Sequence, residues 1–236
     1  GNVSPCCEYR GYLPNLKGSD SYDNYFNNEY LNTIKQKFID QEYPEECENC
    51  RLQDLTEVLS MRKKLSNYSY DMDNFKLRYF DERFNNLCNF SCKMCGESLS
   101  STWGNIQLSI GESKNSAIKK SNVNLNHIFQ RIDEIEHMTF AGGEPLLVQE
   151  TFDILEYCVN NNSTNKEINI VTNGSLLHRG QIDILNYFKT VRVVVSLDCL
   201  GEQHNYWRQK NTFNQVQKNI QKLLDDNVPL SIRCTI

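Results

Sequence analysis

The sequence predicts an α/β fold, a partial (β/α)6-type parallel barrel in which five strands are present. From residue 74 onward, apolar β-branched runs alternate with amphipathic segments of helical length. That alternation is typical of parallel β-α units joined by right-handed crossovers. Each of the first four expected strands is followed by a loop rich in glycine, cysteine or polar residues. Parallel β/α barrels carry their functional side chains at these C-terminal strand ends, so one functional rim is predicted.

The composition and charge argue against a nucleic-acid-binding, membrane-associated or disulfide-bonded protein. The chain has 236 residues, a formal net charge of −5 and 39% hydrophobic residues. Acidic and basic residues are mixed along it without a basic stripe, so a nucleic-acid partner is not expected. The sequence shows neither a membrane-spanning apolar run nor a signal segment, and we expect a cytoplasmic protein without membrane association. Ten cysteines in such a chain suggest metal binding rather than disulfides.

The two ends of the sequence suggest a piece of a longer chain. The first residue is Gly1 rather than methionine, and residues 230–236 have the pattern of a strand still in progress. We therefore expect truncation at both ends, in the N-terminal segment and in the barrel.

Residues 1–73 are predicted to form an N-terminal cysteine-containing segment, and residues 74–236 the core domain. Residues 8–27 lack a sustained period and are expected to be a loop. A helix follows, with one apolar face made of Leu31, Ile34 and Phe38, and it ends at Pro44. The apolar face of a second helix is expected to contain Leu52, Leu55, Val58 and Leu59. A polar connector precedes the core domain.

Strands and helices are expected to alternate in the core domain. The expected strands cover residues 77–80, 137–140, 168–171, 191–197 and 230–236. The expected helices cover residues 97–110, 126–135, 149–160, 181–188 and 213–226, and residues 111–122 form an exposed loop. The fourth strand is nearly continuous in β-branched residues, which is typical of a strand covered on both faces.

Three cysteines with the spacing Cys-x3-Cys-x2-Cys follow the first strand: Cys88, Cys92 and Cys95. Thiolates are ligands of iron–sulfur clusters, and three of them leave one iron of a four-iron cluster without a protein ligand. Structural zinc usually has four closely set Cys or His ligands, and here the next cysteine is Cys158. The spacing favours an open iron–sulfur cluster. A zinc-binding, cysteine-rich interaction protein is the alternative.

The loop after the second strand reads Gly142-Gly143-Glu144-Pro145. The glycines allow the backbone to approach a ligand closely, and Glu144 offers an acceptor for an ammonium group. A plain strand-to-helix turn is the other interpretation. Together with the cysteine motif one β/α unit earlier, this loop resembles the radical S-adenosylmethionine (SAM) superfamily. In that family the segment holds the amino group of the methionine part of SAM.

Two further positions resemble the same family. Asn173, in Thr172-Asn173-Gly174, follows the third strand, where the family's turn borders the SAM pocket. A simple Asn-Gly turn has the same sequence. Met94 stands where the family often places a hydrophobic residue against the adenine, and a packing methionine is equally compatible with the sequence.

The end of the fourth strand resembles a Ser-x-Asp motif followed by an arginine. The resemblance implies that Ser196 and Asp198 contact the ribose of SAM and that Arg208 binds its carboxylate. A capped strand end and a surface arginine are the alternatives. Cys199 departs from the family pattern, which has glycine there, and it is a candidate for the neighbourhood of the substrate.

The N-terminal cysteines resemble parts of a twitch or SPASM auxiliary-cluster module that precedes the barrel instead of following it. Gly1-x4-Cys6 is followed later by Cys47-x2-Cys50. The resemblance implies a second iron–sulfur cluster bound by Cys6 or Cys7 together with Cys47 and Cys50. A small zinc site is the alternative.

The resemblance as a whole implies a radical SAM enzyme. Its [4Fe–4S] cluster would bind SAM at the open iron and cleave it with one electron from a low-potential donor such as flavodoxin or ferredoxin. The resulting 5′-deoxyadenosyl radical would abstract hydrogen from a peptide or a small molecule. An RNA substrate is an alternative that the acidic charge disfavours. Cys158 and Cys234 are expected to be buried apolar residues, and the four histidines show no metal-binding spacing.

Overall fold

The computed structural model describes residues 3–17, 20–56, 58–65, 76–113, 117–177, 182–210, 213–226 and 230–233. The chain divides into two compact units: Gly1–Lys76 with Asn122–His127, and Leu77–Ser121 with Ile128–Ile236. The boundary predicted at residue 74 lies outside the described residues. No helix in the described ranges has the length and apolar character needed to span a bilayer.

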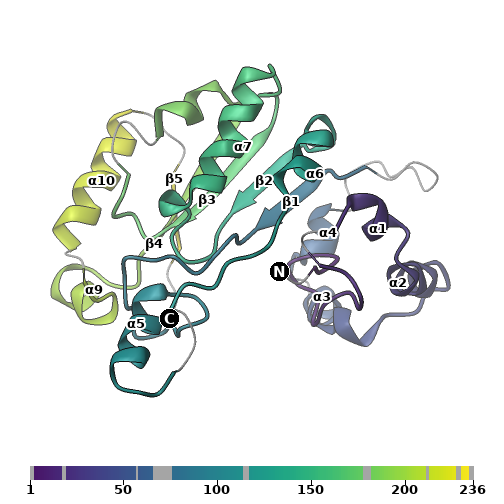
Figure 1. Cartoon of the computed structure of the whole chain (residues 1–236), viewed down its shortest axis with the longest axis horizontal. Helices are drawn as coiled ribbons and strands as arrows, with labels where there is room; N and C mark the ends of the chain where they lie inside the picture. Colours follow the sequence, from purple (N-terminus) through teal and green to yellow (C-terminus); the bar gives the residue numbers. More distant parts are fainter. Residues whose placement is uncertain are drawn as a thin grey trace. The chain divides into compact units, whose positions relative to one another are not determined.

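Short helices surround a small apolar core in the first unit. They are α1 (Tyr22–Phe26), α2 (Glu29–Ile39), α3 (Glu48–Leu55) and α4 (Met61–Leu65), with the 3-10 turn η1 (Glu45–Cys47) before α3 (Figure 1). Asn28 begins α2, because its side-chain oxygen accepts a hydrogen bond from the backbone N–H of Leu31. The core consists of Tyr9, Leu13, Leu16, Leu31 and Ile34.

Several predictions for this unit are wrong. Residues 8–27 contain α1 and three of the five core residues, and are therefore more than a loop. Leu31 and Ile34 are buried as predicted, but Phe38 is 39% exposed. The predicted apolar face of the second helix is between 50% and 71% exposed, and α3 buries Cys50 instead. Core residues contributed by an irregular segment have no helical period, so periodicity cannot reveal them.

A five-stranded parallel sheet forms the second unit, in the order β1-β2-β3-β4-β5 (Figure 1). Its strands are β1 (Tyr79–Glu82), β2 (His137–Phe140), β3 (Glu167–Thr172), β4 (Thr190–Ser196) and β5 (Leu230–Arg233). Each strand pairs in parallel with the next one along the chain. Within the described residues β1 and β5 are the two edges. The sheet is therefore open, as the prediction of a partial barrel requires.

Helices connect the strands. They are α5 (Ser101–Ser109), α6 (Leu125–Gln130), α7 (Gln149–Asn160), α9 (Gly201–Trp207) and α10 (Phe213–Asp225), with the 3-10 turns η2 (Ile132–Glu134), η3 (Pro145–Leu147) and η4 (Asp183–Tyr187). The predicted bounds of β2 and α7 are confirmed. The helix α5 begins four residues later than predicted, because the hydroxyl of Ser100 caps it by accepting from the N–H of Trp103.

Other connections differ from the prediction. The helix expected at 126–135 is divided into α6 and η2, and the helix expected at 181–188 is the 3-10 turn η4. The sequence pattern missed α9 altogether. Its one buried residue is the polar His204, so no apolar period marks this helix. The loop 111–122 contains a buried residue, Ala117.

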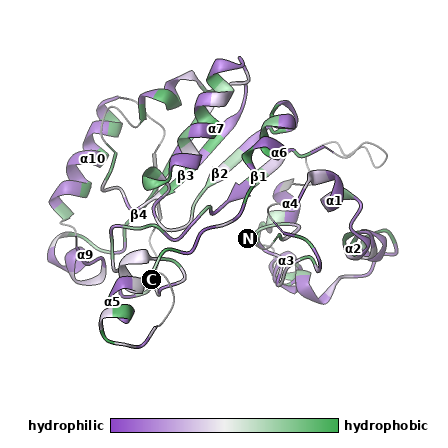
Figure 2. Ribbon diagram, in the orientation of Figure 1, coloured by the Kyte–Doolittle hydropathy of each residue, from purple (hydrophilic) through white to green (hydrophobic). Residues whose placement is uncertain are grey.

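The sheet has one apolar face and one mixed face. Alternate strand residues are at most 6% exposed: Phe80, Met138, Phe140, Ile168, Ile170, Val193 and Val195. Helix α10 packs near this face, since a β-carbon at Gly174 would lie 2.9 Å from Val195 and 3.0 Å from Val216. Helix α7 contributes the fully buried Cys158, as predicted, and Figure 2 shows its mixed hydrophilic and hydrophobic turns. Cys234 lies outside the described residues.

The fourth strand was predicted to be covered on both faces, and this is wrong. Val191, Val193 and Val195 are buried, whereas Arg192 is exposed and Val194 is partly exposed. The alternation is that of a strand with one fully covered face. The other face of the sheet is mixed: it carries the polar side chains of Asp81, Thr139 and Asn169 together with Tyr79, Val171 and Val194.

Candidate functional site

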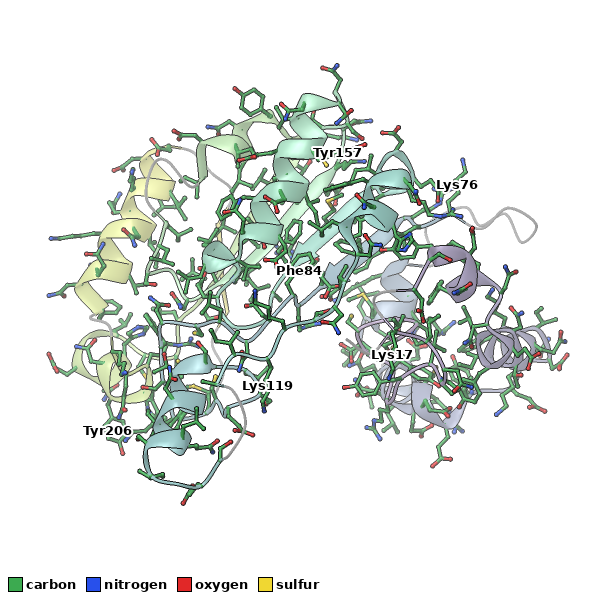
Figure 3. All side chains as sticks on the ribbon, in the orientation of Figure 1. Lys17, Lys76, Phe84, Lys119, Tyr157 and Tyr206 are labelled. Carbon is green, nitrogen blue, oxygen red and sulfur yellow. The ribbon has the colours of Figure 1, made fainter. Side chains whose placement is uncertain are left out.

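The loop with the three cysteines is fixed at its start by Asn86. The Asn86 side-chain nitrogen donates to the carbonyls of Glu97 (2.6 Å) and Ala117 (2.9 Å), and its Oδ1 accepts from the N–H of Lys119 (2.8 Å). Phe84 and Lys119, which are labelled in Figure 3, lie on the two segments that this hydrogen bonding joins. The loop therefore has a defined shape supplied by protein groups alone.

The first turn of α5 holds the cysteine loop from the other side. Thr102 donates its hydroxyl to the carbonyl of Cys88 (2.7 Å), and Trp103 donates Nε1–H to the carbonyl of Cys92 (2.7 Å). Ser100 donates to the carbonyl of Phe90 at 2.6 Å. Carbonyls bound in this way point toward α5, so the backbone conformation between the cysteines is fixed.

The thiols of Cys88, Cys92 and Cys95 lie close enough to influence one another. A hydrogen bond between Cys92 and Cys95 lowers the pKa of Cys95 to about 7 and raises that of Cys92. Burial raises the pKa of Cys88, and the backbone N–H of Phe90 opposes the rise by donating to its sulfur at 3.4 Å. In the described part of the chain, no three His, Cys, Asp or Glu side chains already converge as ligands of a single metal ion.

Gly142 and Gly143 lie directly against the cysteine loop. A β-carbon on Gly143 would lie 2.3 Å from the carbonyl oxygen of Leu87, and the N–H of Glu144 donates to that same oxygen at 2.7 Å. Gly142 has a φ of +117° and its β-carbon would lie 3.0 Å from the carbonyl oxygen of Asn85. Glycine is therefore required at these two positions because the backbone of this segment packs closely against the cysteine loop.

Glu144 is fully buried and joins the loops after β2 and β3. Its carboxylate accepts from the N–H of Asn173 (2.8 Å), the hydroxyl of Thr172 (2.7 Å) and the N–H of Leu146 (3.2 Å). The bond from Leu146 also caps η3. The Glu144 carboxylate therefore accepts hydrogen bonds from three groups of the protein itself. The sequence had predicted that it would contact the ammonium group of a ligand.

The protonation of Glu144 gives a testable dependence of stability on pH. Burial raises its pKa from 4.5 to about 7, and the three hydrogen bonds oppose the rise. The folded protein then binds more protons than the unfolded chain between these values, so stability falls as pH rises from about 4.5 to 7. We expect a fall of up to about 3 kcal/mol in the unfolding free energy, at about 1.4 kcal/mol per pKa unit. The unfolding free energy, measured by urea unfolding at several pH values, should depend less steeply on pH in Glu144→Gln than in the unchanged protein. An equal dependence on pH in the two proteins would contradict the assignment.

Asn173 connects the loop after β3 to the cysteines. Its side-chain nitrogen donates to Oδ1 of Asn89 at 2.9 Å and lies 4.0 Å from the sulfur of Cys88. The side-chain nitrogen of Asn89 in turn donates to the hydroxyl of Ser175 at 2.9 Å. The sequence pattern did not indicate Thr172 or Asn89 as residues of the site. The position of Asn89 between two of the motif cysteines was the one feature of the sequence that could have indicated its place in the site.

Asp198 and Arg208 form a buried ion pair at the end of β4. Nε of Arg208 donates to Oδ2 of Asp198 (2.7 Å) and Nη2 donates to Oδ1 (3.2 Å), with side chains 8% and 5% exposed for Arg208 and Asp198. Nη1 of Arg208 lies 3.9 Å from the sulfur of Cys92. Asp198, predicted to contact the ribose of SAM, and Arg208, predicted to bind its carboxylate, are therefore bonded to each other in this structure. Ser196 ends β4 and is partly buried.

The last residue of α9 and the segment after it also contact the cysteine loop through the backbone. The N–H of Lys93 donates to the carbonyl of Trp207 (2.8 Å), and the N–H of Ser91 donates to the carbonyl of Gln209 (3.3 Å). The ammonium group of Lys93 lies 3.1 Å from the ring centre of Tyr206, which is labelled in Figure 3. The fourth rim loop is therefore attached to the first one on both sides of Cys92.

We expect Asp198→Asn to destabilise the domain by about 3–5 kcal/mol, because it leaves the buried Arg208 guanidinium without its counter-charge. A matched control is Glu136→Gln, which breaks a pair with Arg78 in which the Glu136 and Arg78 side chains are 44% and 33% exposed. Pairs of that exposure contribute at most about 1 kcal/mol. Chemical unfolding of both variants measures the difference, and similar losses in the two would contradict the role given to Asp198.

Two remaining candidates, Met94 and Cys199, and the unassigned His204 lie in different environments. Met94 is 41% exposed, so it is not a core residue in the described structure. Cys199 is partly buried. His204 is fully buried against the ring of Phe213, and burial lowers its pKa.

The N-terminal cysteines lie within the first unit. Cys6 and Cys47 pack against its apolar core, and Cys50 is buried. Burial raises the pKa of Cys6, and raises that of Cys47 to about 11, with further contributions from the charges of the neighbouring cysteines. Cys7 is exposed. Cys6, Cys47 and Cys50 therefore lie in the same part of the first unit, although they do not converge as ligands of a single metal ion in the described structure.

The family of this chain follows from a comparison with models of known protein families. The family model described as the radical SAM superfamily matches residues 83–236, which include all four rim loops. The chain belongs to the radical SAM superfamily. Its members are enzymes, so the prediction of an enzyme domain is confirmed. A comparison with curated proteins gives no match.

The chain is similar to solved structures of two proteins. A histidine-tagged anSMEcpe with bound AdoMet is 21% identical, with a TM-score of 0.50, over 68% of this chain and 42% of that one. SuiB of Streptococcus suis bound to S-adenosylmethionine is 14% identical, with a TM-score of 0.46, over 87% of this chain and 44% of that one. The first likeness confirms the partial-barrel fold. The chain spans less than half the length of these proteins.

Proposed function

We propose that the radical SAM domain binds a [4Fe–4S] cluster through Cys88, Cys92 and Cys95, and SAM at the iron without a protein ligand. One observation carries this proposal: the loops after β2, β3 and β4 all contact the cysteine loop. Gly143 lies against Leu87, Asn173 lies against Asn89, and Arg208 reaches Cys92. This convergence at one end of a parallel sheet is the arrangement of a barrel active site.

The donors around the cysteines fit a cluster bound by thiolates. The N–H of Phe90 and the side-chain nitrogen of Asn173 face the sulfur of Cys88, and the guanidinium of Arg208 faces that of Cys92. Hydrogen bonds to sulfur ligands stabilise their negative charge and adjust the potential of a bound cluster. When bound, the cluster and SAM would supply a 5′-deoxyadenosyl radical for hydrogen abstraction from a substrate.

We assign SAM to the residues around this loop. The segment Gly142–Glu144 would hold its amino group, with Glu144 acting as a positioning residue through its bonds to Thr172 and Asn173. Ser196 and Asp198 would face the ribose, Nη1 of Arg208 the carboxylate, and Met94 the adenine. Asn173 would border the pocket.

The finer classification is part of the same proposal. We assign the first unit to the twitch or SPASM type, with Cys6, Cys47 and Cys50 as ligands of a second iron–sulfur cluster and Cys7 as the alternative to Cys6. The proximity of the three thiols supports this assignment. The proposed partners are a low-potential electron donor such as flavodoxin or ferredoxin, and a peptide or small-molecule substrate.

Anaerobic purification and reconstitution test the function. We expect a brown protein that absorbs near about 400 nm, with about four irons per chain for the core site and about eight if the second cluster forms. Dithionite and SAM should then yield methionine and 5′-deoxyadenosine. A colourless protein with stoichiometric zinc would favour the interaction-protein alternative, and salt-dependent RNA binding would favour the RNA-modifying one.

A further inference from the structure

One side of helix α3 in the first unit is apolar and exposed. Leu52 and Leu55 are three residues apart, so they lie on the same side of the helix, and they are 50% and 71% exposed. The segment after the helix turns back toward it, because the N–H of Val58 donates to the carbonyl of Gln53 at 3.0 Å. This segment adds Val58 and Leu59, which are 53% and 59% exposed. We call Leu52, Leu55, Val58 and Leu59 the α3 face.

The α3 face is distinct from the apolar core of the first unit. That core consists of buried side chains from the segment before α2 and from α2 itself, and no residue of the α3 face belongs to it. A single exposed leucine is ordinary, whereas large apolar side chains that are each at least half exposed and lie together mark an interaction surface. The α3 face is therefore a surface that a partner would cover.

Charges of opposite sign lie at the two ends of α3. The turn η1, which directly precedes the helix, begins with two acidic residues, of which Glu45 is exposed. The basic helix α4 lies near the other end, because Arg62 of α4 pairs with Asp54 in the last turn of α3. Lys64 of α4 is exposed. Neither Glu45 nor Lys64 forms an ion pair with any residue that the structure describes.

We propose that the α3 face is the interface of a two-fold symmetric dimer of this chain. In such a dimer both copies use the same surface, so the surface must be complementary to itself. Two α3 helices that pack antiparallel bring their leucines together and remove them from water. The same arrangement places the acidic end of each copy against the basic end of the other, with Glu45 opposite Lys64 at both ends of the interface.

The charge pattern favours a second copy over other occupants. An acidic protein, a nucleic acid or an anionic membrane surface would meet the basic end favourably but would be repelled by the acidic end. A uniformly basic partner has the opposite difficulty. A second copy of this chain carries both charges at the required positions, because a two-fold axis exchanges the two ends.

Sedimentation of the full chain over a range of concentrations tests this inference. The exposed Cys7 calls for a reductant, so that a disulfide cannot produce the dimer. We expect a reversible equilibrium between monomer and dimer. Leu55→Glu should weaken dimerisation by more than about tenfold, because one leucine is lost at each of two symmetric positions. Leu224→Glu is the matched control, since Leu224 is 51% exposed in α10 of the second unit, and it should leave the equilibrium unchanged.

Exchanges of charge test the symmetry of the interface. Glu45→Lys and Lys64→Glu each place like charges opposite one another and should weaken dimerisation by about threefold or more at low salt. A mixture of these two variants should dimerise as well as the unchanged chain, because every contact between the ends again joins opposite charges.

Circular dichroism shows whether each variant is folded, and Leu52→Glu replaces Leu55→Glu if that variant is not. A chain that stays monomeric at all concentrations, a dimer that Leu55→Glu leaves intact, or a mixture that fails to restore dimerisation would each overturn the inference. The measurement involves neither SAM nor iron, so its outcome is independent of the function proposed above.

Discussion

Replacing Cys92 with alanine is expected to abolish both iron binding at the core site and reductive cleavage of SAM. Cys92 is 4% exposed, and it is the thiol on which Cys95 and Arg208 converge. Its loss removes one of three protein ligands. Because removing groups that only support a metal ligand already costs about 10–100-fold, we expect 5′-deoxyadenosine formation to fall by more than about 100-fold. Iron analysis and product quantification under anaerobic conditions measure both effects.

The matched control for this variant is Cys158→Ala. Cys158 is fully buried in α7 and outside the cysteine loop, so its replacement changes a buried thiol without touching the proposed ligands. Iron content and SAM cleavage should stay at the level of the unchanged protein. If SAM cleavage persisted in Cys92→Ala, the assignment of the three cysteines would be wrong.

Among the glycines in the described ranges, Gly143 is the one whose replacement by alanine is expected to be most damaging. The new β-carbon would lie 2.3 Å from the carbonyl oxygen of Leu87 and 2.7 Å from the carbonyl carbon of Asn86. Both are backbone atoms that cannot rotate away, so the cysteine loop must shift. We expect a loss of about 3 kcal/mol or more in the unfolding free energy, together with a loss of bound iron.

Gly96→Ala is the control, because its β-carbon would have no atom within 4 Å although Gly96 follows Cys95 directly. Its effect on stability should stay within about 0.5 kcal/mol. Urea unfolding followed by circular dichroism compares the two variants. A small effect of Gly143→Ala would show that the loops after β1 and β2 can separate at little cost.

The sequence was sufficient to predict the parallel sheet and the group of residues at its rim. Cys88, Gly143, Asn173 and Arg208 all follow strands, and the structure brings their loops together because parallel strands end at the same edge. The alternation of apolar and polar residues in β2 and β3 reports burial directly, whereas the continuous β-branched run of β4 did not. The bounds of β2 were therefore predicted correctly from the sequence.

What the sequence did not predict depends on contacts between irregular segments. Nothing in the pattern indicated that Glu144 is enclosed by donors from Thr172 and Asn173, or that Asp198 and Arg208 bind each other. The core of the first unit contains Tyr9, Leu13 and Leu16 from a segment without a period. Polar side chains that join loops, and apolar ones within loops, leave no periodic signal.

The contacts of the rim loops have a consequence for how the domain would acquire the proposed iron–sulfur cluster. Arg208 and Cys92 are 116 positions apart in sequence, and Asn173 and Cys88 are 85 apart. Contacts between such distant residues close long loops, and they form slowly during folding. The three thiols therefore acquire their surroundings only after β4 and α9 have docked. A chain that stops before residue 208 would present the same cysteine motif without Arg208 beside Cys92, so uptake of the proposed cluster would report folding of the second unit as far as Arg208.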